Sequence, residues 1–118
     1  MRKLFEEDKY NFMDSIIDKI ELSDNLKDYL TTIDYHQGKQ DSKILVLRLR
    51  NATCFVYHNE NIKKRGEVVN SLTIAHISKK ITDNGVEITI ESALSCLPEH
   101  ENDPLLIRCL CENAYIES

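Results

Sequence analysis

The stretch from Lys43 to His58 constrains the fold of this chain more than any other segment. It reads KILVLRLRNATCFVYH, with Leu45, Leu47 and Leu49 at every second position. Because successive side chains of a β-strand point to opposite faces, this spacing places the three leucines together on one buried face. Asn51 interrupts the alternation, and we expect a bulge or tight reversal there that divides the run into two strands.

The later sequence predicts further strands. Residues 71–77 alternate, the turn signal Asp83-Asn84-Gly85 follows, and residues 86–91 alternate again, which is typical of a β-hairpin. Short links of this kind join antiparallel neighbours, and no βαβ crossover is visible. The full set of predicted strands is 43–50, 52–58, 71–78, 86–92 and 105–112.

The N-terminal residues show a different spacing. Their apolar members recur at intervals of three, four and seven, which is typical of an amphipathic helix. These members are Leu4, Phe5, Phe12, Met13, Ile16, Ile17 and Ile20. The pattern predicts a helix over 3–22, and a cap at Ser23 or Asp24 predicts a shorter one over 24–31.

Together these elements predict an α+β fold, with N-terminal helices packed on an antiparallel β-meander of about five strands. A length of 118 residues fits one domain, helical over 1–31 and sheet over 32–118. The predicted core consists of the inward-facing apolar side chains of both parts: Phe12, Ile16, Ile20, Leu45, Leu47, Leu49, Ile74, Ile88 and Ile107.

Composition bounds the class of protein. With 42% hydrophobic and 30% charged residues and few glycines and prolines, collagen-like and disordered chains are excluded. No apolar run approaches the roughly 18–20 residues of a membrane helix, so we expect a cytoplasmic protein. We expect its four cysteines, Cys54, Cys96, Cys109 and Cys111, to be reduced thiols.

Charge is distributed in blocks. Residues 43–80 carry 8 Lys and Arg against 2 Asp and Glu, and residues 81–118 carry 1 against 8. One interpretation is cross-strand pairing of a basic strand with an acidic hairpin. The other is an acidic surface for a basic partner, formed by Glu87, Glu91, Glu99, Glu101 and Asp103. Nucleic-acid binding would depend on residues 63–65 and 79–80, and a sequence pI near 5.3 opposes it.

The sequence contains no complete catalytic or metal-binding motif. Cys109 and Cys111 would share a strand face, but two thiols are too few for a tetrahedral zinc site. His58 and His76 could be cross-strand neighbours, and the remaining histidines, His36 and His100, lie in predicted loops. We therefore expect neither an enzyme nor a cofactor or metal.

The layout of the sheet half resembles that of small, acidic, mostly β bacterial proteins that often serve as immunity or antitoxin proteins. The resemblance rests on the order of three segments over residues 43–118: KILVLRLRNATCFVYHNEN, SLTIAHISKKITDNGVEITIES and DPLLIRCLCENAYIES. It implies a non-enzymatic protein that binds a toxin domain and covers its active site.

We therefore expect an immunity protein, monomeric or weakly dimeric, that uses its acidic residues to bind a basic toxin domain such as a nuclease. Two alternatives stay open. The first is a small-molecule-binding or enzymatic domain with a pocket between helix and sheet, lined by residues such as Tyr57, His58 and His76. The second is a viral or mobile-element protein that inhibits a host factor.

Overall fold

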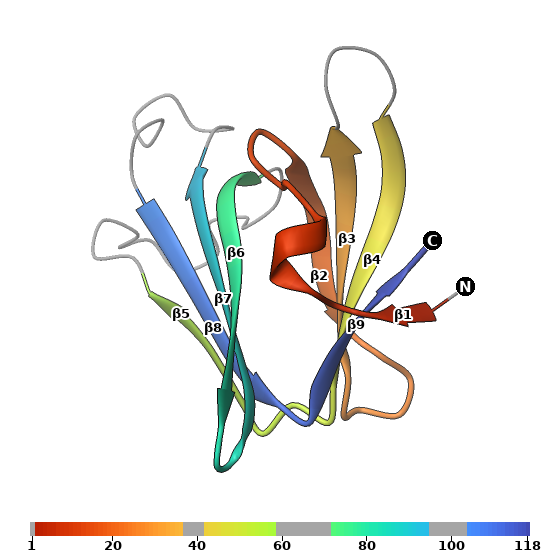
Figure 1. Cartoon of the computed structure of the whole chain (residues 1–118), viewed down its shortest axis with the longest axis vertical. Helices are drawn as coiled ribbons and strands as arrows, with labels where there is room; N and C mark the ends of the chain where they lie inside the picture. The colour runs from red at the N-terminus through yellow and green to blue at the C-terminus, as the bar shows by residue number, and fades with distance from the viewer. Residues whose placement is uncertain (1, 37–41, 59–71, 95–103) are drawn as a thin grey trace.

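The computed structural model describes residues 2–36, 42–58, 72–94 and 104–118, and these residues form an all-β fold. Their strands are β1 (Arg2–Leu4), β2 (Ile16–Leu22), β3 (Tyr29–His36), β4 (Ser42–Arg50), β5 (Cys54–His58), β6 (Leu72–Thr82), β7 (Gly85–Leu94), β8 (Pro104–Cys111) and β9 (Asn113–Glu117). A 3-10 turn, η1 (Glu7–Lys9), is the sole helical element within these ranges (Figure 1).

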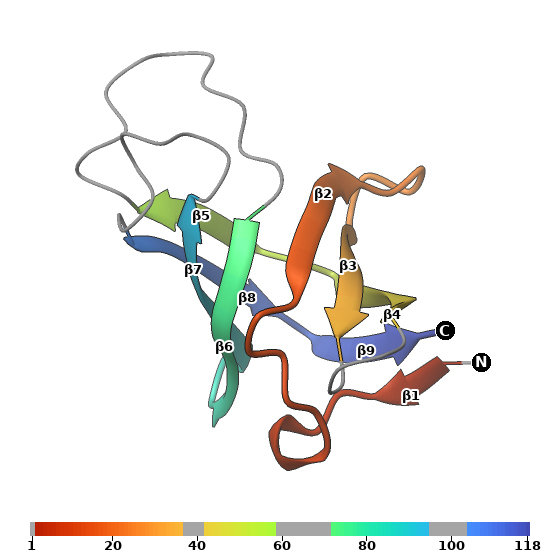
Figure 2. The ribbon, with the colours of Figure 1, turned by 90° about the horizontal axis from the view of Figure 1, so that it is seen from above.

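The strands form one sheet in the order β1-β9-β4-β3-β2-β6-β7-β8-β5, and every pairing is antiparallel. The sheet is bent into two layers that face each other, β6, β7, β8 and β5 in one and β2, β3, β4, β9 and β1 in the other (Figure 2). β8 and β9 are separated only by Glu112, yet they pair with strands near opposite ends of the sheet order. The bent segment 104–117 therefore connects the layers.

The core lies between the two layers. Its buried apolar side chains are Phe5, Phe12, Ile17, Ile33, Tyr35, Leu45, Leu47, Leu49, Ile74, Ile77, Val86, Ile88, Ile90, Ile107, Cys109, Cys111, Ala114 and Ile116. Leu45, Leu47 and Leu49 are all buried, so the face of β4 that their alternation predicted is the one that packs in the core. Of the predicted core, Ile16 and Ile20 are only partly buried, and the other seven residues are buried.

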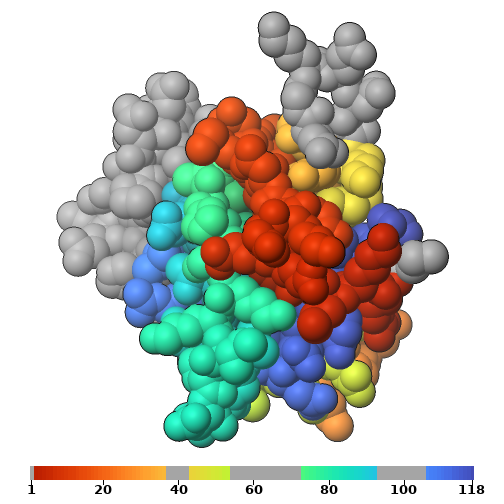
Figure 3. Space-filling view, in the orientation of Figure 1, coloured from red at the N-terminus to blue at the C-terminus, as the bar shows by residue number. Residues whose placement is uncertain are grey.

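The N-terminal segment closes one side between the layers. The Phe5 amide donates to the Ala114 carbonyl on β9 at 2.8 Å, and the Lys79 amide on β6 donates to the Glu7 carboxylate at 2.7 Å. In the space-filling view these N-terminal residues cover the middle of this face (Figure 3). Residues 5–15, in the middle of the segment that the sequence predicted as a helix, therefore form a largely irregular cover for the core.

The prediction of an α+β fold is wrong, because 3–22 and 24–31 are not helices. Residues 16–22 form β2, and 24–28 belong to the loop that leads into β3. Asp14 and Leu26 adopt positive φ angles of 68° and 60°, which a right-handed helix does not allow. The meander of about five strands is likewise too small, since the described residues alone form a sheet of nine strands.

A β-bulge explains the helix-like spacing. In the pairing of β2 with β3, Ile17 lies opposite Ile33 and Ile20 opposite Thr31, with a register shift between Ile17 and Lys19. Because a bulge inserts one extra residue, inward side chains are separated by three positions rather than two. This interval imitates the spacing of one helix face.

All five strands predicted after residue 42 are confirmed as β4 to β8. The hairpin prediction is confirmed by the β6–β7 pairing, in which Thr82 lies opposite Gly85. The prediction that Asn51 divides the long alternating run is also confirmed, because Asn51 has a φ of 54° and separates β4 from β5.

Two neighbouring isoleucines test whether the N-terminal segment is a strand. Ile17 is fully buried, so Ile17→Ala should lower the free energy of unfolding by about 2–5 kcal/mol through lost burial and a residual cavity. Ile16 is half-buried, and Ile16→Ala should cost about 1 kcal/mol. Urea unfolding of both variants gives the comparison. A larger loss for Ile16 than for Ile17 would contradict this register.

Gly85 provides a second test of the fold. Its φ is +137°, and a Cβ atom there would lie 2.5 Å from the Cys111 carbonyl oxygen, so either the turn or β8 must move. We expect Gly85→Ala to lower the free energy of unfolding by more than about 1 kcal/mol. The exposed neighbour Asp83 is the control, and Asp83→Ala should change it by less than about 0.5 kcal/mol. Equal effects in thermal or urea unfolding would show that the turn tolerates a side chain.

Candidate functional site

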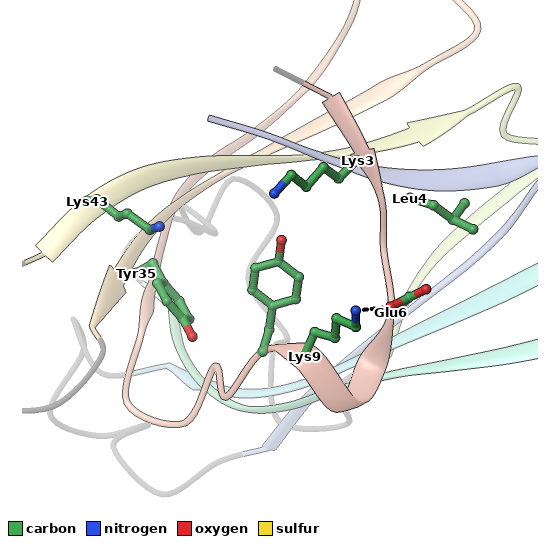
Figure 4. A pocket seen from close by; sticks show the side chains of 7 residues that line it. Lys3, Leu4, Glu6, Lys9, Tyr35 and Lys43 are labelled. Atoms are coloured by element: carbon green, nitrogen blue, oxygen red, sulfur yellow. Dashed lines mark ion pairs between the residues drawn. The ribbon is translucent and has the colours of Figure 1, made fainter.

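A pocket of about 550 Å³ opens where the N-terminal segment meets the beginning of β4 and the end of β3. It is lined by Lys3, Leu4, Glu6, Lys9, Tyr10, Tyr35 and Lys43. The side chains of Lys3 and Lys43 enter it from opposite sides (Figure 4). This is the volume of a small-molecule site, and its lining combines aromatic rings with ammonium groups.

The strand register explains why lysines line this pocket. In an antiparallel pair, directly opposite residues share a face of the sheet. Lys43 lies opposite the buried Tyr35, and it continues the inward series of Leu45, Leu47 and Leu49 by one step. Lys3 lies opposite the buried Ile116. Both lysines therefore occupy inward-facing positions at the point where the core ends.

The wall beside these lysines is aromatic. The ring centroids of Tyr10 and Phe12 are 5.5 Å apart in a stacked arrangement, and Phe12 and Tyr35 are 5.3 Å apart edge to face. The Tyr35 hydroxyl accepts a hydrogen bond of 3.3 Å from the Asn11 amide. Because Tyr35 is buried and its hydroxyl is held, this wall of the pocket is preorganised.

The pocket is positively charged on a chain whose net charge is −5. Lys9 pairs with Glu6 at 3.3 Å, and the Lys43 ammonium lies 6.0 Å from the centroid of the Tyr35 ring. Within the described ranges, no carboxylate pairs with Lys3 or Lys43. Two ammonium groups without acidic partners at one opening favour the binding of an anion.

The structure places the predicted acidic residues in two groups. Glu87 and Glu91 lie on the outer face of β7, opposite Lys80 and His76 on β6. On the other side of β7, Arg108 lies opposite Thr89, between the two glutamates. This arrangement is the mixed-charge surface that cross-strand pairing predicts. Glu99, Glu101 and Asp103 lie outside the described residues, so their role stays a prediction.

The predicted pocket of Tyr57, His58 and His76 is not the one observed. Its helix does not exist, and β7 and β8 separate β5 from β6 in the sheet, so His58 and His76 are not cross-strand neighbours. His76 is exposed on β6, and the side chains of Tyr57 and His58 lie outside the described part of the chain. The basic residues 63–65, on which nucleic-acid binding would depend, also lie outside the described part of the chain.

The sequence contained one indication of the pocket that was actually found. Lys43 stands two positions before Leu45, so the alternation alone places a charged residue on the core face at the start of a strand. Lys3, Lys9 and Tyr10 give no such indication, because their positions depend on pairing with β9 and on the path of η1.

Metal-binding groups are scarce in the part of the chain that is described. No cluster of three or more His, Cys, Asp or Glu side chains there could hold a metal ion. Cys109 and Cys111 are buried, and neither is part of a disulfide. Within the same ranges, no helical segment has the length and apolar character needed to cross a membrane.

The chain matches no protein-family model, and no curated protein shows significant sequence similarity to it. The functional argument therefore rests on the residues and their geometry.

An ion-pair network lies on the outer face of β4. The Arg48 guanidinium donates to the Asp28 carboxylate at 2.8 Å and also binds the Glu117 carboxylate. Asp28 accepts a second hydrogen bond of 2.9 Å from the Asn51 amide. Burial alone would raise the pKa of Asp28, but the hydrogen bonds from Asn51 and Arg48 outweigh it and lower the pKa. The hydrogen bond from Arg48 likewise lowers the pKa of Glu117.

The network predicts a loss of stability in acid. Because both carboxylates have lowered pKa values when folded, their contribution is complete above the unfolded pKa of about 4 and is lost as pH falls through the folded values. Asp28→Asn should lower the free energy of unfolding by about 1–3 kcal/mol near neutral pH. Urea unfolding should show this difference shrinking below about pH 4. A difference independent of pH would contradict the role of the charge.

Proposed function

We propose that this protein is a binding domain that holds an anionic small molecule, one bearing a phosphate or carboxylate group, in the pocket between Lys3 and Lys43. The observation that carries the proposal is the presence of two inward-directed lysines, neither paired with a carboxylate of the described residues, at a preformed opening of about 550 Å³. The net charge of the chain is negative, so its long-range field repels anions. The positive charge of the pocket can therefore attract an anion only at short range.

The proposed ligand is held by two kinds of contact. The anionic group lies between the ammonium groups of Lys3 and Lys43, where it offsets their mutual repulsion and gains charge-assisted hydrogen bonds. The body of the ligand packs against Tyr10, whose ring is partly buried and stacked on Phe12. Lys9 is already paired with Glu6 and sets the limit of the pocket on that side.

Binding rather than catalysis fits the residues that line this pocket. Its lining contains no Ser, Cys or His, so the usual pairing of a nucleophile with a histidine base has no candidate there. The predicted immunity function stays an untested prediction. Among the described acidic residues, Glu87 and Glu91 stand among basic side chains and give it no separate support.

Lysine substitution tests the proposed pocket. With inorganic phosphate and citrate as probes, NMR titration should show shifts at Tyr10, Tyr35 and the two lysines. Lys3→Gln and Lys43→Gln should each weaken the affinity by about tenfold to a hundredfold, since a hydrogen bond to a charged group contributes about 1.5–3 kcal/mol. Added salt should weaken binding further.

Lys80→Gln is the matched control, because it removes the same charge from an exposed position on the outer face of β6. It should leave the affinity for both probes unchanged. The proposal fails if phosphate and citrate produce no shifts around the pocket, or if Lys80→Gln weakens binding as much as the pocket variants do. If the loss of any lysine weakened binding equally, the effect would reflect only the overall charge of the protein and not the pocket.

A further inference from the structure

Four connections between strands gather at one end of the molecule, the lower end in Figure 1. They are the β2–β3 loop, the β4–β5 corner, the β6–β7 turn and the β8–β9 corner. Together they surround a pocket of about 460 Å³, whose lining includes Leu26, Lys27, Ala52, Asn84 and Glu112. This turn pocket shares no residue with the anion pocket between Lys3 and Lys43, so it requires an explanation of its own.

Leu26 is the most unusual residue at this end. It is 73% exposed, and its φ is 60°. In this left-handed region the Cβ atom crowds the following carbonyl oxygen, so glycine or asparagine usually occupies such a position. The leucine therefore strains the backbone without filling the core. A loop that only joins β2 to β3 gains nothing from it, and strain of this kind is typical of functional sites.

The loop holds Leu26 in a fixed position. The Asn25 side-chain oxygen accepts hydrogen bonds from the Lys27 and Asp28 amides at 2.9 and 3.2 Å. The Lys27 carbonyl accepts from the Ala52 amide at 2.8 Å, which ties the loop to the β4–β5 corner. Because the loop is ordered before any contact, a partner that binds Leu26 loses little affinity to the cost of ordering it.

The charges beside Leu26 indicate what that partner is. Lys27 and Glu112 both line the turn pocket, and no ion pair joins either of them to another described residue. The surface thus combines an apolar projection, a hollow beside it and one charge of each sign. A two-fold axis places each feature opposite its complement on the second copy, because both copies use the same patch. A second copy of this chain therefore complements the whole surface.

We propose that this chain forms a symmetric dimer through the turn pocket, in which Leu26 of each copy enters the pocket of the other. There the leucine packs beside Ala52, and Lys27 of each copy pairs with Glu112 of the other. The contact is small, so the dimer is weak and forms at high protein concentration. Neither this proposal nor that of the anion pocket depends on the other.

Leu26→Gly tests the dimer. Sedimentation velocity of the unmodified protein from about 20 µM to about 1 mM should show a rising share of dimer, since small interfaces give transient complexes. Leu26→Gly should lower the association constant at least about tenfold, because two buried leucines are lost from each dimer. It also relieves the strain at this position, so the melting temperature of the dilute variant should stay the same or rise. Damage to the fold would lower it.

Met13→Gln is the matched control, because Met13 is 59% exposed and precedes β2, whereas Leu26 follows that strand. It should leave the association constant unchanged. Lys27→Glu should weaken association about tenfold, since it faces Glu112 of the other copy with a like charge. Lys19→Glu changes the net charge equally from an exposed position on β2 and should have little effect. The proposal is overturned if the protein stays monomeric at about 1 mM, or if Leu26→Gly dimerises as the unmodified protein does.

Discussion

The fold depends on a corner where the chain passes twice between the two layers. β4 leads into β5 at Asn51, and β8 leads into β9 at Glu112. The two crossings are tied together, because the Glu112 amide donates to the Arg50 carbonyl and the Asn51 side chain donates to the Glu112 carboxylate, both at 2.8 Å. Asp28 adds a third attachment by accepting from the Asn51 amide. Since each crossing chain belongs to both layers, the inner faces are held together without a helix to cover them.

One inward face carries the core and the candidate pocket. Along β4 it changes from leucine to Lys43 where the strand reaches the surface, and this change produces the anion pocket. Along β8 the same face stays buried through Ile107, Cys109 and Cys111. The lysines Lys3 and Lys43 are therefore positioned by the same period of two that buries the apolar residues. Strands carry Lys3, Leu4, Tyr35 and Lys43, whereas Glu6, Lys9 and Tyr10 lie on the segment that follows β1.

The sequence was a reliable guide wherever the alternation was unbroken. Leu45, Leu47 and Leu49 identified a strand and its buried face correctly. It was misleading at Ile17 and Ile20, because a bulge separates inward residues by three positions and imitates a helix. Lys3 could not be placed at all, since its position depends on pairing with β9, at the far end of the chain, and the position of Tyr10 depends on the path of η1. Local periodicity contains no information about such distant pairing.

The position of β9 between β1 and β4 has a consequence for synthesis of the chain. β4 pairs with β3 on one side, but its other neighbour begins only at Asn113. Until the ribosome has made that segment, β4 presents an open edge rich in leucine, and such edges pair readily with other chains. Lys43, Arg48 and Arg50 lie along this strand, and charged side chains discourage that pairing. The basic residues of β4 are thus placed to discourage aggregation of the nascent protein, and in the folded protein Lys43 lines the pocket and Arg48 forms the ion-pair network.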